Sequence, residues 1–151
     1  TCTQKNIPVF VDPKLQSWSR FRNATFLTHN LHELEKYLNK KIITDEEIVA
    51  AGNEILKDLN LRWLLVTLGK DGMCLVSNDG QVKFIKSTAR EVFDVSGAGD
   101  TVIACLAAFF SMGADFIRST EIANYAAGIV VGKVGSQPIY FEELKDYLIN
   151  K

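Results

Sequence analysis

No stretch of this 151-residue sequence is apolar over a length that would cross a bilayer, and no signal peptide is recognisable. Neither sign of charge is in excess, because the net charge at pH 7 is only −1, and nothing electrostatic points to a nucleic acid or an anionic membrane as partner. Cysteine is scarce, with three widely spaced residues, of which Cys74 and Cys105 lie in apolar runs. Core thiols in a reducing cytosol fit this pattern better than a disulfide framework, so we expect a soluble cytoplasmic protein.

Three familiar site motifs are also absent. The glycine-containing stretch at residues 96–101 has no P-loop lysine, and Val102 stands where a dinucleotide fingerprint needs its third glycine. The HExxH zinc pattern that begins at His32 would need a histidine where Lys36 stands. We therefore expect His29 and His32 to be surface or internally satisfied histidines and not metal ligands.

What the chain does contain is an alternation of short apolar segments and amphipathic segments with helical spacing. Its length and its 47% hydrophobic content suffice for one domain with a real core, and no internal repeat or linker interrupts it. The pattern predicts an α/β fold with a mainly parallel sheet and one antiparallel hairpin closed by residues 78–80. The expected strands are residues 9–12, 25–28, 63–68, 73–77, 81–86 and 90–95, and the expected helices begin at 29 and 44 and span 102–112, 121–133 and 142–148.

Residues 94–101 stand out because they place two glycines and an alanine between a predicted strand and a predicted, largely buried helix. Free amides at a helix start, with the positive end of the helix dipole, make an anion site, and Gly97, Ala98 and Gly99 let a ligand approach closely. Asp100 falls in the first helical turn, where its carboxylate can take a proton from a hydroxyl that attacks phosphorus. The same residues would also suit a helix start that binds nothing.

A second polar stretch follows the buried strand at 63–68. Thr67, Gly69 and Gly72 form a two-glycine turn, which would either face nucleotide phosphates or simply lead into the hairpin. Both interpretations remain open on local grounds.

A third candidate lies at the helix that begins near residue 29. Asn30 and Glu33 share one face of that helix start, and one amide with one carboxylate suits Mg²⁺. The same pair equally suits an N-cap with a first-turn glutamate.

Ligands of such sheets bind beyond the carboxyl ends of the strands. Asp12, Asn30, residues 67–69 and residues 97–100 each follow a predicted strand, so we expect them to share one site. The small residues around Asn124 and Gly128 would either wall a flat apolar slot for a base or allow tight helix packing.

The motifs together resemble a known family. Residues 94–101 are similar to the D-T-x-G-A-G-D signature of the PfkB/ribokinase-like carbohydrate kinases. Asn30 and Glu33 resemble the N-x-x-E motif of that family, and residues 67–72 resemble its phosphate-contacting turn, in the same order along the chain. More narrowly, residues 11–14, 28–31 and 127–135 resemble the heptose 7-phosphate kinases of ADP-heptose synthesis within the family.

This resemblance implies a ribokinase-like three-layer α/β/α fold and a role for each candidate residue. Asp100 would be the base for the sugar hydroxyl, and the amides of residues 97–100 would form the anion hole for the transferred phosphoryl group. Asn30 and Glu33 would organise Mg²⁺. The residues implied to bind the nucleotide are Thr67, Gly69, Gly72, Asn124 and Gly128. The implied cofactors are ATP, Mg²⁺ and, behind the anion hole near residues 135–136, a monovalent cation such as K⁺.

Complete members of the family are considerably longer, and the half that supplies their sugar pocket and lid has no counterpart here. We therefore expect residues 1–151 to be the C-terminal, nucleotide-binding and catalytic half of a single kinase domain, nearly inactive alone and with an apolar sheet edge exposed. The implied reaction phosphorylates a sugar hydroxyl with ATP, converting heptose 7-phosphate to heptose 1,7-bisphosphate for ADP-heptose and lipopolysaccharide-core biosynthesis.

Two alternatives remain open at this stage. One is another kinase of the same family, acting on fructose, ribose, a nucleoside or another phosphosugar. The other is a catalytically silent nucleotide-binding module. The partners expected are a small sugar phosphate and ATP, and the sequence leaves open whether the protein is a homo-oligomer.

Overall fold

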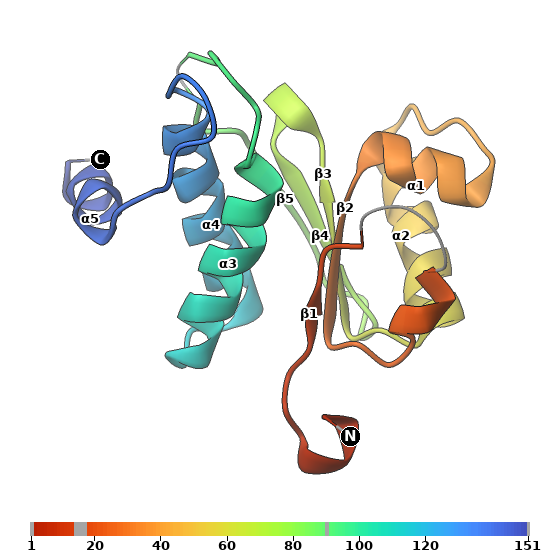
Figure 1. The fold of residues 1–151 in the computed structure, drawn as a ribbon. Coiled ribbons are helices and arrows are strands. Elements are labelled where there is room, and N and C mark those ends of the chain that lie inside the picture. Colours follow the sequence, from red (N-terminus) through yellow and green to blue (C-terminus); the bar gives the residue numbers. More distant parts are fainter. Residues whose placement is uncertain (1, 14–17, 90, 151) are drawn as a thin grey trace. The chain divides into compact units, whose positions relative to one another are not determined.

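Five strands form one mixed sheet in the N-terminal part of the chain (Figure 1). The computed structural model describes residues 2–13, 18–89 and 91–150. Lys14, which ends the 11–14 motif, and Arg90, which begins the predicted strand at 90–95, lie outside them. The chain forms two compact units, Thr1–Ile85 and Lys86–Lys151.

The sheet of the first unit has the strand order β1-β2-β3-β4-β5. The first three strands pair in parallel, and β3, β4 and β5 pair antiparallel, as the predicted hairpin requires. The strands are β1 (Phe10–Val11), β2 (Phe26–Asn30), β3 (Trp63–Thr67), β4 (Met73–Ser77) and β5 (Val82–Ile85). Short 3-10 helices lie at Thr3–Lys5, Trp18–Phe21 and Gly69–Asp71.

Two α-helices complete the first unit and pack on the sheet, α1 (Leu31–Leu38) and α2 (Asp45–Leu59). Both begin with a capping box, in which the N-cap side chain accepts the N3 amide and the N3 glutamate accepts the N-cap amide. Both end at an asparagine in the left-handed conformation, which asparagine tolerates better than most residues. The predicted cap at Thr44 is confirmed.

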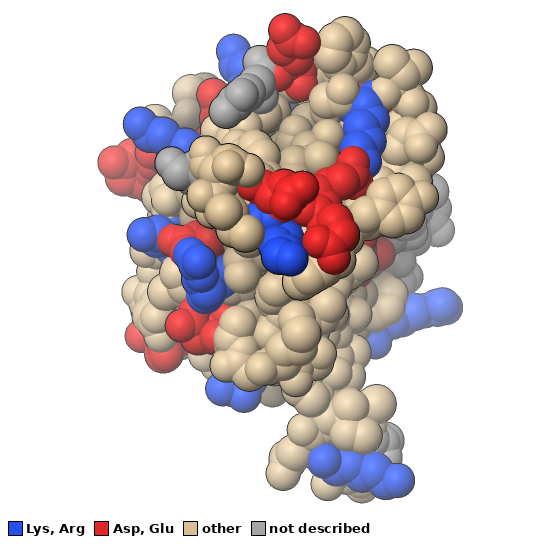
Figure 2. Space-filling view, turned by 90° about the vertical axis from the view of Figure 1, so that its left-hand side faces the viewer, with Lys and Arg blue, Asp and Glu red and all other residues tan. Residues whose placement is uncertain are grey.

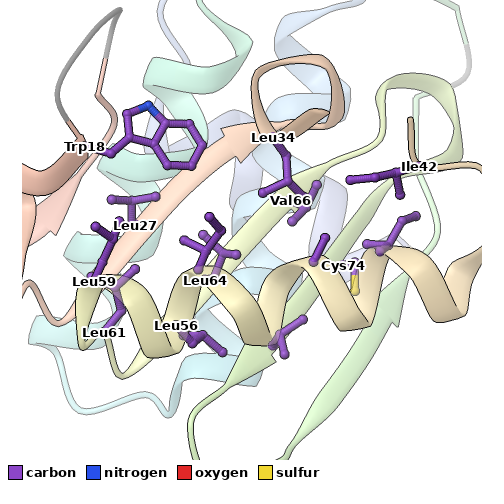
Figure 3. Packing of buried hydrophobic residues seen from close by; sticks show 14 of the residues in the cluster. Trp18, Leu27, Leu34, Ile42, Leu56, Leu59, Leu61, Leu64, Val66 and Cys74 are labelled. Atoms are coloured by element: carbon purple, nitrogen blue, oxygen red, sulfur yellow. The ribbon is translucent and has the colours of Figure 1, made fainter. Parts of the chain in front are cut away.

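The core of the first unit lies between α2 and the sheet (Figure 3). The predicted inward stripe of α2 is fully or almost fully buried. Strand β3 is apolar and buried on both faces, as its continuous run of apolar residues predicts. Helix α1 contributes the buried Leu34 and is otherwise half-exposed. The stripe of α2 consists of Ile48, Ala51, Ile55 and Leu59, joined by Gly52 and Leu56.

The second unit is helical, with α3 (Ala98–Ser111), α4 (Phe116–Val130) and α5 (Phe141–Ile149). Helices α3 and α4 pack along each other, and α5 packs on α4 through a smaller cluster that includes Ile122, Ala126 and Leu144. None of the helices in the described part of the chain is both long enough and apolar enough to cross a membrane.

Three expectations about the second unit were wrong in detail. Residues 91–95 form no strand; instead, the amides of Phe93 and Asp94 donate to the carbonyl of Val131 at 2.8 and 3.3 Å. Helix α3 starts at Ala98 rather than at 102, so the glycine-containing turn is itself part of the helix start. Helix α4 starts at 116 rather than 121, because the Asp115 side chain accepts the Arg118 amide at 2.7 Å and caps it.

Helix α3 is also less buried than its composition predicts. Along this helix only Val102 and Leu106 are buried, and the remaining residues are half-buried or exposed.

Candidate active site

Strand pairing places two of the predicted site residues side by side at one edge of the sheet. Asn30 at the end of β2 is the register partner of Thr67 at the end of β3, and the Thr67 hydroxyl donates to the carbonyl of His29 at 3.4 Å. Asp12 follows the end of β1, which pairs in parallel with β2. Within the first unit, the expected convergence at the carboxyl ends of the strands is therefore present.

The Asn30–Glu33 pair forms a capping box. The Asn30 Oδ1 atom accepts the Glu33 amide at 2.8 Å, and the Glu33 Oε2 atom accepts the Asn30 amide at 3.1 Å. His29, which is buried and stacked on Trp18, places its Nδ1 atom 3.2 Å from the same Glu33 oxygen. No group of three or more His, Cys, Asp or Glu residues within the described ranges is arranged to hold a metal.

The geometry of Glu33 still leaves room for a cation held largely by water. Its side chain is 37% exposed, and the same oxygen, Oε2, makes its contacts with the Asn30 amide and with His29. Mg²⁺ often binds proteins through one or two carboxylates and several waters, so a single carboxylate oxygen at this edge fits such an ion. The two histidines differ in exposure: His29 is buried, with its Nδ1 atom beside Glu33, and the His32 side chain is 83% exposed.

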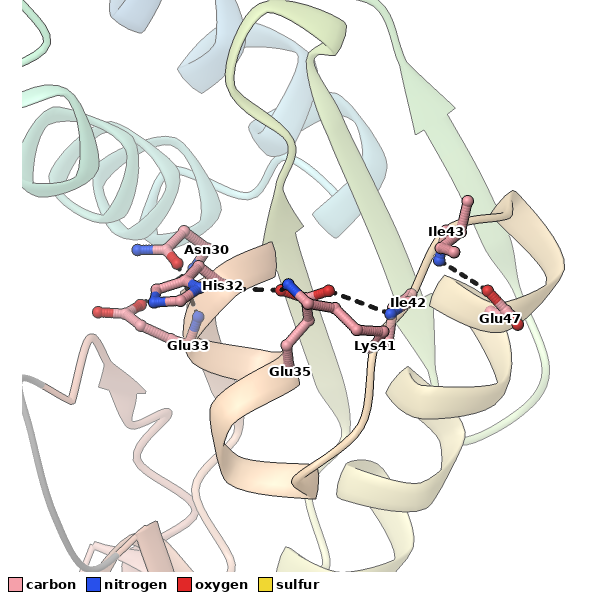
Figure 4. A network of polar contacts seen from close by, with 8 residues as sticks. All are labelled: Asn30, His32, Glu33, Glu35, Lys41, Ile42, Ile43 and Glu47. Atoms are coloured by element: carbon pink, nitrogen blue, oxygen red, sulfur yellow. Dashed lines mark hydrogen bonds and ion pairs between the residues drawn. The ribbon is translucent and has the colours of Figure 1, made fainter.

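The loop that follows α1 is held by carboxylates that accept backbone amides (Figure 4). Glu35 accepts the Ile42 amide at 3.1 Å and pairs with Lys41 at 3.2 Å, and the Ile42 hydrogen bond is the main cause that lowers the pKa of Glu35. Glu47 accepts the amides of Ile43 and Thr44 in the same way. These contacts fix the chain between α1 and α2, and therefore support the helix that carries Glu33.

The turn after β3 depends on its two glycines. Gly69 and Gly72 have φ angles of 60° and 105°, which side-chain-bearing residues rarely adopt. The Leu68 amide donates to the Gly72 carbonyl at 2.8 Å, and the Gly72 amide donates to the Gly69 carbonyl at 3.2 Å. Gly69 is exposed, and a Cβ built there would meet nothing within 4 Å, so the backbone conformation alone requires glycine.

The second unit carries the other candidate cluster, at the start of α3. Gly97 is the N-cap, with a φ angle of 79°, and its carbonyl accepts the Thr101 amide at 2.9 Å. The Ala98 amide donates to the Val95 carbonyl at 3.2 Å, so it is already engaged in the turn, whereas no such bond is found for the Gly99 amide. Asp100 is exposed at the N3 position, beside the positive end of the helix dipole.

The side chain of Asp94 stabilises this turn through a hydrogen bond. Its Oδ1 atom accepts the Ser96 amide at 2.8 Å, and the backbone amide of Gly135 lies near enough to affect the pKa of this carboxylate. The Ser96 amide first, then the Ser96 hydroxyl and the Gly135 amide, hold the pKa of Asp94 below its usual value. Asp94 is therefore ionised at neutral pH and works as an acceptor that organises the backbone.

A pocket of about 410 Å³ opens beside α4 and is lined by Gly128 among others. Asn124, which is 4% exposed, does not line it; its Nδ2 atom donates to the Lys86 carbonyl at 2.9 Å. The Thr88 hydroxyl donates to the Asn124 carbonyl at 3.3 Å, so Asn124 holds the wall of the pocket in place. The lining residues are Thr88, Glu91, Phe93, Gly128, Ile129, Gly132 and Tyr147.

Most residues that line this pocket could not be predicted from the sequence. Thr88, Glu91 and Tyr147 carry no motif, and Tyr147 reaches the wall from α5, where its hydroxyl donates to the Thr88 carbonyl at 3.4 Å. Only the small residue at 128 was detectable from the sequence.

The candidate residues thus form two groups, one in each unit. The sheet edge of the first unit carries Asn30, Glu33, Thr67, Gly69 and Gly72, and the second unit carries Gly97, Ala98, Gly99, Asp100, Asn124 and Gly128. On the face drawn in Figure 2, acidic and basic side chains are interspersed.

Solved structures define the class of fold. Phosphofructokinase-2 from Escherichia coli, in complex with substrates and products, aligns with a TM-score of 0.85 and 16% identity over 98% of this chain and 48% of its own. Ribokinase from Thermotoga maritima aligns with a TM-score of 0.85 and 23% identity over 99% of this chain and 52% of its own. Ribokinase from Arabidopsis thaliana, complexed with ribose and ATP, aligns with a TM-score of 0.81 and 24% identity. The fold is ribokinase-like.

The chain belongs to the pfkB family of carbohydrate kinases, whose family model matches residues 1–142. It is 46% identical over 136 residues to the bifunctional protein HldE of Paramagnetospirillum magneticum, and 43% identical over 141 residues to the protein of that name from Haemophilus influenzae. These alignments cover 90% and 93% of this chain, but only 28% and 29% of the relatives' length. The resemblance seen in the sequence motifs is confirmed.

Proposed function

We propose that this chain carries the nucleotide-binding and phosphoryl-transfer part of a sugar kinase that uses ATP. The start of α3 is the observation that carries the proposal. It combines a left-handed glycine N-cap, a Gly99 amide not used by the turn and a carboxylate at N3. An anion hole beside a base is what phosphoryl transfer to a hydroxyl requires.

The chemistry follows from the charges. Phosphoryl transfer passes through a loose transition state, so catalysis consists mostly of positioning and of stabilising negative charge. The Gly99 amide and the dipole of α3 face that charge, and each charge-assisted hydrogen bond contributes about 1.5–3 kcal/mol. Asp100 accepts the proton of the sugar hydroxyl as the bond to phosphorus forms.

The pocket beside α4 suits the base of the nucleotide. Its volume, about 410 Å³, lies within the range of small-molecule sites, and its lining is largely apolar with a few polar groups. Gly128 leaves space at its wall, and Asn124 fixes the wall through Lys86 and Thr88. We place adenine here and the phosphates toward the start of α3.

Residues of this chain also suit the binding of Mg²⁺ and of a monovalent cation. Glu33, with Asn30 orienting it, would hold Mg²⁺ largely through water, and Thr67 and Gly69 would contact the nucleotide phosphates. The ionised Asp94 and the backbone near Gly135 suit a monovalent cation such as K⁺, because a carboxylate and peptide carbonyls are hard oxygen ligands. Mg²⁺ supplies neutralisation of phosphate charge when bound.

The substrate we propose is heptose 7-phosphate, phosphorylated to heptose 1,7-bisphosphate in ADP-heptose synthesis in the cytoplasm. The similarity of residues 11–14, 28–31 and 127–135 to heptose 7-phosphate kinases supports this choice, and so does the identity of 43–46% to proteins named HldE. An assay of the full-length protein with heptose 7-phosphate, fructose 6-phosphate, ribose and a nucleoside tests it. Faster turnover of any other acceptor would overturn the choice.

The role of Asp100 is tested by Asp100→Asn in the full-length protein. Because the amide cannot accept the proton, we expect kcat to fall about 10²–10⁴-fold. The dissociation constant for Mg-ATP, measured by calorimetry, should stay similar or decrease, since a negative charge beside the phosphates is removed.

The matched control is Asp45→Asn. Asp45 is likewise an exposed aspartate in a first helical turn, that of α2, so both variants lose the same interaction with a helix dipole. Asp45→Asn should leave kcat unchanged. If kcat of Asp100→Asn stayed within a few-fold of the wild-type value, Asp100 would not be the general base.

A further inference from the structure

Lys133 lies near the beginning of the loop between α4 and α5. Its ammonium group contacts Pro138, near the end of that loop, and Glu143, in the first turn of α5. The Nζ atom lies 2.7 and 2.8 Å from the two carboxylate oxygens of Glu143 and donates to the Pro138 carbonyl at 3.0 Å. Glu143 also accepts the Tyr140 amide at 2.8 Å, which caps α5. The side chains of Lys133 and Glu143 are 23% and 37% exposed, so the pair is partly shielded from solvent.

The same loop supports the phosphate-binding turn, which we define as residues 94–100. The backbone amide of Gly135 lies near the Asp94 carboxylate, which accepts the Ser96 amide, and it contributes to the lowered pKa of Asp94. A Cβ built on Gly97 would lie 3.0 Å from the Ser136 Oγ atom, so the Ser136 side chain lies close against the backbone of Gly97. The loop therefore lies against the turn at Asp94 and at the N-cap of α3.

The loop is held near its two ends, where the buried Val131 accepts the amides of Phe93 and Asp94 and where Ile139 packs against the cluster between α4 and α5. Residues 131–140 form no helix or strand, and Val134 is 79% exposed. A segment with few buried apolar contacts opens locally at small free-energy cost. The Lys133–Glu143 pair is a charged contact that ties the loop to α5.

We propose that Lys133, through its ion pair with Glu143, is a positioning residue for the phosphate-binding turn. It restrains residues 133–140, which in turn hold Asp94 and Gly97 in the conformation that exposes the Gly99 amide. The consequence for ATP binding rests on the proposed function, but the restraint itself does not.

The restraint is tested without ligand, by amide hydrogen exchange followed by NMR on this chain. Lys133→Met keeps the aliphatic stem and removes the charge. We expect the Ser96 amide, which donates to Asp94, to exchange about tenfold faster, while the buried amides of Ala123 and Ala126 in α4 keep their rates. Lys133→Arg, which retains the charge, should restore slow exchange at Ser96.

The matched control is Lys145→Met, which breaks an exposed ion pair with Glu142 at 3.5 Å on α5. It should leave the Ser96 amide unchanged. Two results would overturn the proposal: equal exchange at Ser96 in Lys133→Met and Lys145→Met, or uniform acceleration at Ser96, Ala123 and Ala126, which would indicate a merely structural role.

Calorimetry with Mg-ATP on the same variants separates the two proposals. If the chain binds Mg-ATP, Lys133→Met should weaken binding about tenfold and Lys145→Met should not. If wild type binds no nucleotide, the proposed function fails for this chain, while the exchange result still decides the role of Lys133.

Discussion

Gly128 brings the backbone of α4 closer to residues 86–89 than any side chain would allow. A Cβ there would lie 2.6 Å from the Thr88 Oγ1 atom and 3.1 Å from the Ala89 amide nitrogen. Both interpretations of the sequence at this position are therefore compatible with the structure, since Gly128 packs tightly and also lines the pocket. Gly132 lines the same pocket, but the nearest atom to a Cβ there is the Ile129 carbonyl oxygen at 3.4 Å.

Gly128→Ala should lower the free energy of unfolding by about 1–3 kcal/mol, because the backbone at Thr88 and Ala89 must move to admit the methyl group. Urea unfolding followed by circular dichroism measures it. Gly132→Ala is the control, with an expected change within about 0.5 kcal/mol. Equal stabilities for the two variants would contradict the close approach seen at Gly128.

Helix starts are the elements for which local sequence was most informative. The spacing Thr44-x-x-Glu47 predicted a capping box, and both of its hydrogen bonds are present in α2. The spacing Asn30-x-x-Glu33 allowed a cap or a metal site, and the structure contains the cap. Helix α3 differs, because its N-cap is a glycine that makes no side-chain hydrogen bond.

Thr44→Ala should lower the free energy of unfolding by about 1 kcal/mol, because the Glu47 amide loses its acceptor at the start of α2. Thr44→Ser keeps a hydroxyl at the N-cap and should recover most of the loss. Thermal and urea unfolding of wild type, Thr44→Ala and Thr44→Ser measure these differences in stability. A serine variant as unstable as the alanine variant would show that the hydroxyl is not what matters.

The chain as a whole forms two units, each with its own packing and its own group of candidate residues. The first unit buries a continuous apolar core that includes Cys74, with no exposed surface. Burial, with a smaller contribution from the charge of Asp45, raises the pKa of the Cys74 thiol from 9.0 to about 12. Cys2 is exposed, so the two thiols differ in access as well.

This raised pKa predicts how stability depends on pH. Below the unfolded-state pKa the thiol is protonated in both states, so its contribution to stability is fully present. As pH rises from 9 towards 12 the unfolded chain forms thiolate and the folded chain does not, so stability is lost. The loss from Cys74 should be about 1.4 kcal/mol between pH 8 and pH 10.

Urea unfolding at pH 8, 9 and 10 for wild type and Cys74→Val measures this loss as the difference between the two proteins, because all other groups titrate in both. At pH 7 a thiol reagent should label Cys2 rapidly and Cys74 only after unfolding. If the free energy of unfolding of the two proteins changed equally with pH, Cys74 would not be a buried thiol that stays protonated in the folded state.

Much of the architecture could be read from local patterns, because caps, turns and periodicity involve residues within a few positions of each other. The hairpin at 78–80, the stripe of α2 and the first-turn position of Asp100 are of this kind. The strand predicted at 90–95 failed for the converse reason. Alternating apolar residues form a strand only beside a partner strand, and the backbone of Phe93 and Asp94 pairs with the end of α4 instead.

Contacts between distant segments came from the folded chain alone. The register of β2 and β3 sets Asn30 beside Thr67, and the packing of α4 and α5 brings Gly128 and Tyr147 to one pocket. The physical reason is that such contacts depend on how whole elements pack, and no short window of sequence contains both partners. Residue types and spacings therefore specified the chemistry available to this protein, and folding specified which of those groups meet.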